Sequence, residues 1–373
     1  MNAHFNAYKA RYAFLDQEFK PIFSVNKINH VNLFINLDDV FHNIHRPLIN
    51  NEFLVYGEDA SKQLMANILN LIAHYRGWIL RQRKTCKVFA IYTGSRRRFK
   101  NTIFIPEYRK HFIDINENMN TQFFYINKAI REAMPLLSVF SNYIEGIYII
   151  DSSYLEPSMI PLMISDFLSI ADWNILITRD TYDYQYSYMG RWSIVYAKSG
   201  QYETTSMITV DNVWDKIKEK NKIELDTHKY DASLLPFALA LTGDKYRGIK
   251  SPKRIGWKTF FNMVEDVYDE EESDTLNTDS IEVSICDKLF LKSKDKTVAT
   301  NLTNNIQAIS IKTQFNNLGD IDKMMIREQI RDIPDIDNLQ KMNKIYFTKY
   351  PININNLTKK VYTPDRTKVN WNV

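Results

Sequence analysis

The stretch that decides the fold is GIYIIDSSYLEPSMIPLMISDFLSIADWNILITRD, residues 146–180. It begins with an apolar run at 146–150 and ends with a second one at 173–178, and residues 156–171 between them have the length of a helix. Strands that are apolar throughout and separated by a helix are typical of a parallel sheet covered on both faces. The stretch therefore predicts a strand–helix–strand unit of an α/β protein.

The same pattern continues upstream of this unit. Two further strands are predicted from apolar runs, VNLFINL at 31–37 and KVFAIYT at 87–93, and two helices at 60–83 and 127–143. Right-handed crossovers place the carboxyl ends of such strands at one edge of the sheet, where these folds carry their ligand sites. The residues that we expect at this edge are 36–39, Thr93, Asp151 and Asp180.

Downstream of residue 192 the pattern changes. Two alternating stretches at 192–199 and 203–210 predict a hairpin or an edge pair. A short amphipathic helix is expected at 212–220, and an apolar helix at 234–242 ends before Gly243. The last hundred residues are polar and rich in Asn and Lys, so we expect an extension that wraps on the body or docks on a partner protein.

Composition sets broad limits on function. The 373 residues are 45% hydrophobic and 25% charged, which is ordinary for a chain with a sizeable core. No apolar run is long enough for a membrane span and no secretory signal starts the chain, so we expect a cytoplasmic protein, in a host cytoplasm or in a virion. The two cysteines, Cys86 and Cys286, lack a zinc-binding spacing and predict neither a zinc site nor a disulfide.

Charge is balanced overall but clustered locally. The formal net charge is +4, so any nucleic-acid contact must come from local basic clusters. One cluster lies at 96–100 and another at 245–258, and an acidic run follows at 265–274. Each run fits a solvated surface, and the basic ones also fit phosphate recognition or an ion-paired protein interface.

Two segments resemble the 5′-nuclease or flap-endonuclease family. Residues 146–187 are similar in layout to its strand, its Glu-Ala-Asp-Asp motif at a helix start, and its strand ending in Asp-x-Asp before a Gln. LALTGDKYRGIKSPKRIGWKTFF at 239–261 looks like its Gly-Asp-x-x-Asp-Asn-Ile-x-Gly-Val-x-Gly-Ile-Gly-x-Lys-Thr motif. The resemblance implies a PIN-like, three-layer fold with a mainly parallel sheet, over residues 1–268, and a duplex-gripping helical hairpin at 234–264. Residues 269–373 would form an acidic linker and a C-terminal extension.

The family's chemistry uses two Mg²⁺ ions about 4 Å apart, and these need six or seven converging carboxylates. At the matching positions this sequence carries mostly other residues, namely Asn36, Thr93, Ser158, Met159, Tyr182 and Arg247. Glu156, Asp180 and Asp244 are retained. The resemblance therefore implies a catalytically degenerate nuclease without a firm cofactor. A residual Mg²⁺ site would be held by Glu156 and Asp180, with Asp38 or Asp39 as a substitute ligand.

The hairpin motif has kept its basic character while losing family glycines. The residues that the resemblance assigns to DNA phosphates are Arg96, Arg97, Arg98, Lys100, Lys245, Lys250, Lys253, Arg254 and Lys258. We therefore expect a DNA-binding or structural subunit of a viral, replication or transcription complex, with DNA or a protein as its partner and no membrane association. The Asn-, Lys- and Ile-rich composition suggests an AT-rich genome, as in a phage or a large DNA virus.

Other interpretations stay open at this point. An active metal-dependent 5′-3′ exonuclease or flap endonuclease with displaced ligands is the first alternative, and a PIN-like ribonuclease is the second. The acids also have plain structural roles available: Glu156 could stabilise a helix dipole, and Asp180 or the pair Asp38 and Asp39 could cap the segments that follow them.

Overall fold

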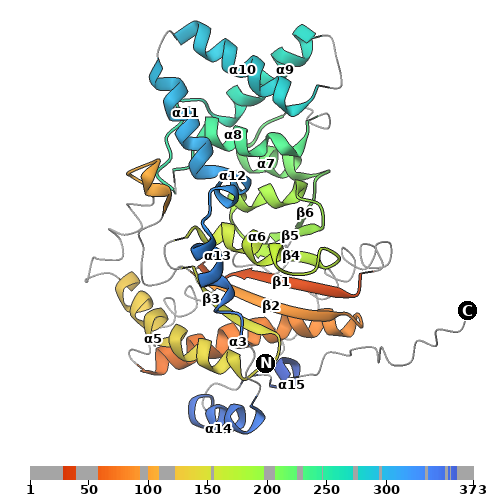
Figure 1. Cartoon of the computed structure of the whole chain (residues 1–373), viewed down its shortest axis with the longest axis vertical. Helices are drawn as coiled ribbons and strands as arrows, with labels where there is room; N and C mark the ends of the chain where they lie inside the picture. Colours follow the sequence, from red (N-terminus) through yellow and green to blue (C-terminus); the bar gives the residue numbers. More distant parts are fainter. Residues whose placement is uncertain are drawn as a thin grey trace, which may run out of the picture.

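A computed structural model gives the fold of the chain (Figure 1). The residues that it describes are 28–38, 58–92, 100–108, 122–152, 155–196, 206–224, 230–245, 247–271, 276–293, 296–331, 335–348, 352 and 354–358. Five strands and their crossover helices follow the predicted order. The strands are β1 (His30–Asn36), β2 (Thr85–Tyr92), β3 (Ile147–Asp151), β4 (Trp173–Thr178) and β5 (Trp192–Tyr196).

These strands form one mainly parallel sheet, as expected from their apolar runs. The six-stranded sheet has the order β3-β2-β1-β4-β5-β6, and all neighbours are parallel except β5 and the short β6 (Ser206–Ile208). Strand order reverses between β1 and β4, which both leave their carboxyl ends at the same edge. In such sheets this reversal is where ligand crevices form. The predicted hairpin at 192–210 is present as the β5–β6 pair.

Helices cover both faces of the sheet, which makes the three layers. One face packs against α3 (Glu58–Arg81) and α5 (Gln122–Asn142) through alternate strand residues such as Leu33, Val88 and Ile149. The other face packs against α6 (Ile160–Asp166) and the 3₁₀ segment η3 (Thr181–Tyr188). Successive side chains of a strand point to opposite faces, so a strand buried on both sides must be apolar throughout. The predicted α/β, three-layer fold is confirmed.

Aromatic rings line the second face from strand to strand. The ring of Phe34 on β1 stacks on Phe89 of β2 with centroids 5.1 Å apart, and Phe89 stacks on Tyr148 of β3 at 5.0 Å. Trp192 of β5 lies 5.3 Å from Phe34. Aromatic pairs on one sheet face stabilise the strand register beyond the burial of their area. The edge where the strands end is therefore held in a fixed register.

The helical hairpin is present, and helices continue beyond it. It consists of α8 (Leu235–Thr242) and α9 (Trp257–Glu271), joined by residues 243–256, and α7 (Val213–Asn221) precedes it. The helix predicted at 156–171 is shorter than expected, because a 3₁₀ turn, η2 (Pro157–Met159), leads into α6, which ends at Asp166. No helix among the described residues has the length and apolar character that a membrane crossing requires.

The described part of the last hundred residues forms helices, and these pack on the body. They form α10 (Thr278–Ser293), α11 (Lys296–Ile309), α12 (Ile311–Asn316), α13 (Asp320–Arg327), α14 (Ile336–Tyr346) and α15 (Ile354–Thr358). Ile281, Ile285 and Leu302 join the same buried cluster as α8 and α9. In Figure 1 the chain runs from α11 through α12 and α13 back along the sheet. The division of the chain at residue 268 remains a prediction.

Candidate functional site at the carboxyl edge of the sheet

Polar side chains from separate segments meet where the parallel strands end. Asn36 closes β1 and Asp180 follows β4, at the edge where the strand pattern predicted them, and Glu156, which the family resemblance singled out, follows β3. Asp180 caps η3, because its Oδ1 accepts a hydrogen bond from the backbone N–H of Tyr182 at 3.0 Å. Glu156 makes no such cap bond, although it precedes η2. Its carboxylate is used elsewhere in the site.

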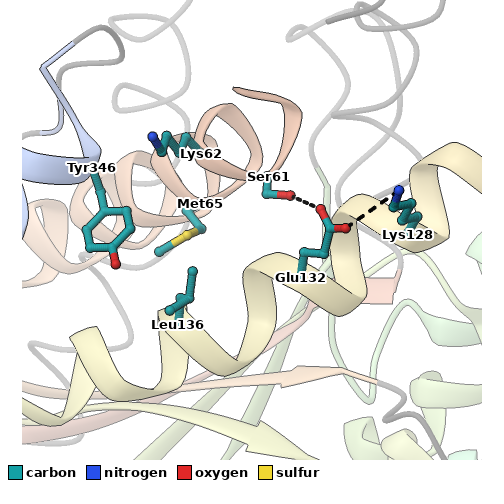
Figure 2. A pocket seen from close by; sticks show the side chains of 7 residues that line it. All are labelled: Ser61, Lys62, Met65, Lys128, Glu132, Leu136 and Tyr346. Atoms are coloured by element: carbon teal, nitrogen blue, oxygen red, sulfur yellow. Dashed lines mark hydrogen bonds and ion pairs between the residues drawn. The ribbon is translucent and has the colours of Figure 1, made fainter. Parts of the chain in front are cut away.

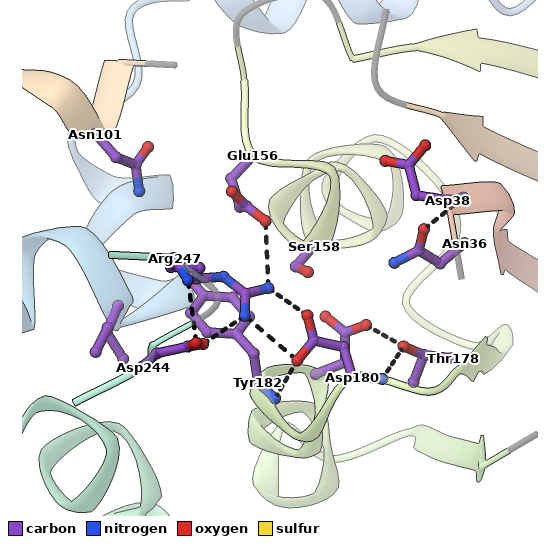
Figure 3. A network of polar contacts seen from close by, with 12 residues as sticks. Asn36, Asp38, Asn101, Glu156, Ser158, Thr178, Asp180, Tyr182, Asp244 and Arg247 are labelled. Atoms are coloured by element: carbon purple, nitrogen blue, oxygen red, sulfur yellow. Dashed lines mark hydrogen bonds and ion pairs between the residues drawn. The ribbon is translucent and has the colours of Figure 1, made fainter. Parts of the chain in front are cut away.

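The guanidinium of Arg247 lies at the centre of this cluster (Figure 3). Its Nη1 donates to Asp244 Oδ2 at 2.6 Å and to Asp180 Oδ1 at 3.3 Å. Its Nη2 donates to Asp180 Oδ2 and lies 3.4 Å from Glu156 Oε1. Figure 3 shows the three carboxylates on different sides of the guanidinium. All three acids that the family resemblance singled out therefore bond to the arginine that stands where the resemblance expects an aspartate.

Burial makes this arrangement strongly coupled. Arg247 and Glu156 are 0% exposed, whereas the side chains of Asp180 and Asp244 keep 17% and 18% of their surface. Burial by itself would lower the pKa of Arg247, but Asp180, Asp244 and Glu156 raise this pKa well above its ordinary value. A buried charge is tolerated only when it is paired and hydrogen-bonded. The arginine therefore stays charged and the carboxylates supply its counter-charge.

A second substitution complements the first. Tyr182 stands where the family carries the second aspartate of Asp-x-Asp, and the Arg247 guanidinium carbon lies 4.0 Å from the centre of its ring. Such a cation over an aromatic face contributes about 2 kcal/mol when both are buried. Burial and then the nearby Glu156 raise the pKa of the Tyr182 hydroxyl well above its ordinary value, so it stays protonated. Arg247 and Tyr182, which both stand where the resemblance expects an acid, thus stack on each other.

The site also contains three residues that the sequence analysis did not identify. Tyr108 donates its hydroxyl to Glu156 Oε2 at 2.6 Å. Gln314 of α12 donates to the Tyr182 hydroxyl at 2.6 Å and accepts from Asn101 at 2.9 Å. Neither Gln314 nor Asn101 belongs to a motif, and the first lies more than a hundred residues from Tyr182 in sequence, so no signal in the sequence pointed to them.

The hairpin sorts its cations into one buried and several exposed groups. In contrast to Arg247, the other cations of this segment are exposed, namely Lys245, Lys250, Lys253, Arg254 and Lys258. They belong to the loop at 243–256 and the first turn of α9. Arg254 has a φ of 57°, in the left-handed region that favours glycine. The five exposed cations are the predicted phosphate contacts that the structure describes in full.

The remaining predicted residues lie at the edge or outside the described part. Asp38 follows β1, and its N–H donates to Asn36 Oδ1 at 3.1 Å, so Asn36 caps this turn. Asp151 ends β3 and accepts a hydrogen bond from the Tyr92 hydroxyl at 3.3 Å. Asp39, Thr93 and the run Arg96, Arg97 and Arg98 lie outside the described residues. Lys100 begins η1 (Lys100–Ile103), and only its backbone is described.

A separate cavity of about 470 Å³ lies between α3, α5 and α14 (Figure 2). Met65, Leu136 and Tyr346 contribute its apolar surface. Its polar groups bond to one another, since Glu132 accepts from Ser61 at 2.9 Å and lies 4.0 Å from Lys128. Its polar side chains are therefore already engaged, unlike those of a site prepared for a charged ligand.

Comparison with solved structures defines the fold. A flap endonuclease of bacteriophage T5, an aspartate-to-lysine pseudo-enzyme in a product complex with DNA and metal ions, superposes with a TM-score of 0.52 at 13% identity, covering 85% of this chain and 98% of that one. The fold is that of a flap endonuclease. The same T5 protein co-crystallised with metal ions gives a TM-score of 0.48 at 13% identity, with 86% and 100% coverage. The T5 5′-exonuclease with bound zinc gives 0.47 at 13%, with 81% and 98% coverage. No protein-family model matches the sequence, and no curated protein matches it.

The side chains at this edge do not fit the pair of divalent ions that the flap-endonuclease fold implies. Glu156, Asp180 and Asp244 already bond to the guanidinium, so their oxygens are engaged by an internal cation and are not free to converge on a metal ion. Within the described ranges no group of three or more His, Cys, Asp or Glu side chains is arranged to hold a metal ion. A hydrated Mg²⁺ gives up water only to several converging oxygens.

Proposed function

We propose that this chain is a catalytically silent flap-endonuclease-fold protein that holds duplex DNA by its helical hairpin. The observation that carries the proposal is the position of Arg247, a buried guanidinium bonded to the three carboxylates at the carboxyl edge of the sheet. Phosphodiester hydrolysis in a two-metal site requires these carboxylates for the ions that activate water and steady the leaving oxygen. Here they neutralise an internal cation.

The exposed cations of the hairpin support the binding half of the proposal. Five lysine and arginine side chains project from the loop at 243–256 and the start of α9. Contacts of this kind with phosphate carry no base information, so they give affinity and position without sequence preference. The T5 neighbour is also a pseudo-enzyme with an added cation, and it holds product DNA. A cation introduced into this fold is thus compatible with DNA binding.

The cellular role follows from the same argument. A nuclease fold that binds without cutting serves as a DNA-holding or assembly subunit of a replication or transcription complex. The Asn-, Lys- and Ile-rich amino-acid composition, which is typical of an AT-rich genome, supports a phage or large-virus source. The opposite interpretation, an active 5′-nuclease, requires other ligands, and Asp38, Asp39 and Asp151 are the acids that would have to supply them.

Binding is tested by salt dependence. The full-length chain is titrated with a labelled duplex at several salt concentrations, beside a variant with Lys250, Lys253 and Arg254 changed to Ala. Each lost phosphate contact should reduce the slope of log K against log salt by about 0.9, hence by about 2.7 for three contacts. The loss should be similar for duplexes of unrelated sequence. Equally weak DNA binding by both proteins would exclude DNA as the ligand of the hairpin and would favour a protein partner there.

A matched control variant replaces three exposed lysines elsewhere, Lys312, Lys341 and Lys344, with Ala and should leave the salt slope nearly unchanged.

Catalytic silence is tested separately by incubating the protein with flap, nicked and single-stranded DNA in the presence of Mg²⁺ or Mn²⁺. No cleavage is expected. Cleavage that disappears in both Asp180→Ala and Glu156→Ala would establish a nuclease with displaced ligands.

A further inference from the structure

The loop between α8 and α9 is attached to the body at two buried points. Arg247 joins it to the sheet edge through Glu156 and Asp180, which follow β3 and β4. On the other side Asn305 of α11, itself buried, donates to the carbonyl of Lys250 at 2.9 Å and to that of Ala240 at 2.9 Å. The loop that carries the exposed cations is therefore tied to both the sheet and the C-terminal helices.

The loop is closed by backbone hydrogen bonds between residues on either side of Arg247. Asp244 and Ile249 pair through both backbone hydrogen bonds, at 2.9 and 2.8 Å, and Asp244 Oδ1 accepts from the Arg247 N–H at 3.1 Å. Gly243 has a φ of 76°, and a Cβ there would lie 2.7 Å from Ile249 O and from Ser251 N. Only glycine fits such a close backbone approach. The turn thus aims Arg247 inward, while Lys245 and Lys250 of the same loop are exposed.

We propose that Arg247 is a positioning residue that fixes the helical hairpin to the sheet edge in place of a metal ion, so that the hairpin binds duplex DNA without any divalent cation. This proposal rests on the proposed function for its DNA-binding part. A fixed loop presents its cations in one arrangement and loses less conformational entropy on binding. In a carboxylate-rich edge without the arginine, the same attachment would require a bound cation to offset the repulsion between acids.

The first arm of the test measures DNA affinity with EDTA and with MgCl₂ at matched ionic strength. The wild-type chain should bind equally well in EDTA, or slightly better, because Mg²⁺ competes for phosphate at any site. Arg247→Asp places a fourth carboxylate in the cluster, so its affinity should fall about tenfold or more in EDTA and recover in part with Mg²⁺. A several-fold gain of wild-type affinity on adding Mg²⁺ would overturn the proposal.

The second arm measures the attachment without DNA, by amide hydrogen exchange of the loop. Arg247→Met should accelerate exchange at Gly248 and Ile249 by about tenfold or more relative to the rest of the chain, since local opening no longer breaks a buried ion pair. Arg247→Lys keeps the charge without the planar fork and should give a smaller acceleration. Lys253→Met is the matched control, because it removes an exposed cation of the same loop and should leave exchange unchanged.

The two arms separate the two proposals. Wild-type protein that fails to bind duplex DNA in both buffers would refute the proposed function, and the exchange arm would still decide whether Arg247 holds the loop. Unchanged exchange at Gly248 and Ile249 in a folded Arg247→Met protein would refute the positioning role. Binding that depends on Mg²⁺ in the wild type would refute the metal-free attachment while leaving DNA binding in place.

Discussion

Replacing Arg247 with methionine should be among the most destabilising single changes in this chain. The side chain is 0% exposed and its guanidinium is the counter-charge of three carboxylates. At an effective dielectric constant of about 20, one pair of opposite charges about 4 Å apart attracts with about 4 kcal/mol. The cost of removing the ions from water offsets much of this attraction. Removing one partner of a buried pair leaves uncompensated charge and typically costs about 3–5 kcal/mol. Methionine fills similar volume, so the loss is electrostatic.

The measurement is the free energy of unfolding from urea titrations of wild type and Arg247→Met. A loss of about 3–5 kcal/mol is a large share of the roughly 5–15 kcal/mol that domains have. Arg131→Met on the exposed face of α5 is the control and should cost less than about 0.5 kcal/mol. A loss below about 1 kcal/mol for Arg247→Met would mean that desolvation cancels the attraction.

Three further changes test other parts of the structure. Gly243→Ala should lower the free energy of unfolding, measured by thermal denaturation, by at least about 2 kcal/mol, because the φ of Gly243 is 76° and the new Cβ would meet backbone atoms. Gly256→Ala is the control and should be nearly neutral, because a Cβ there would have open space. Equal losses in the two variants would contradict this reasoning. Burial, and then Asp279, raises the pKa of the Glu282 carboxyl to about 7. Because the pKa of Glu282 is higher in the folded state than in the unfolded state, its contribution to stability is fully present below the unfolded pKa and is lost as the pH rises through about 7. Melting curves between about pH 5 and 8 should show this loss in the wild-type protein and not in Glu282→Gln. Gln314→Leu removes the bond to Tyr182 and should cost about 1–3 kcal/mol in urea, and an unchanged midpoint would rule out this role.

The sheet was predictable because its strands are buried on both faces. Runs such as VNLFINL and NILIT have no exposed side, so they are mainly apolar and stand out from the helices between them. The end of α6 at Asp166 was not predictable to the residue, since Ser165–Asp166–Phe167 contains no breaker. The C-terminal helices escaped prediction because their apolar stripes are narrow and interrupted by Asn and Thr, as in Leu302–Ile306 of α11.

For the site, the sequence predicted which residues lie at the sheet edge but not how their side chains are directed. Motif spacing located Glu156, Asp180, Asp244 and Arg247 at one edge, since strand ends and the hairpin follow the chain order of the family. Sequence could not show that the arginine turns inward while Lys245 and Lys250 are exposed, because that depends on a backbone turn closed by Asp244 and Ile249. The assignment of these residues to DNA or metal remains a prediction.

The stack of Arg247 on Tyr182 makes each of these two residues depend on the other. An aspartate in place of the arginine alone would face a buried phenol ring, and an aspartate in place of the tyrosine alone would lie beside a guanidinium that already bonds to three carboxylates. Each single change removes the contact between the guanidinium and the aromatic ring without creating an ion site. We therefore expect natural variants of this sequence to carry the arginine and the aromatic residue together or to lack both.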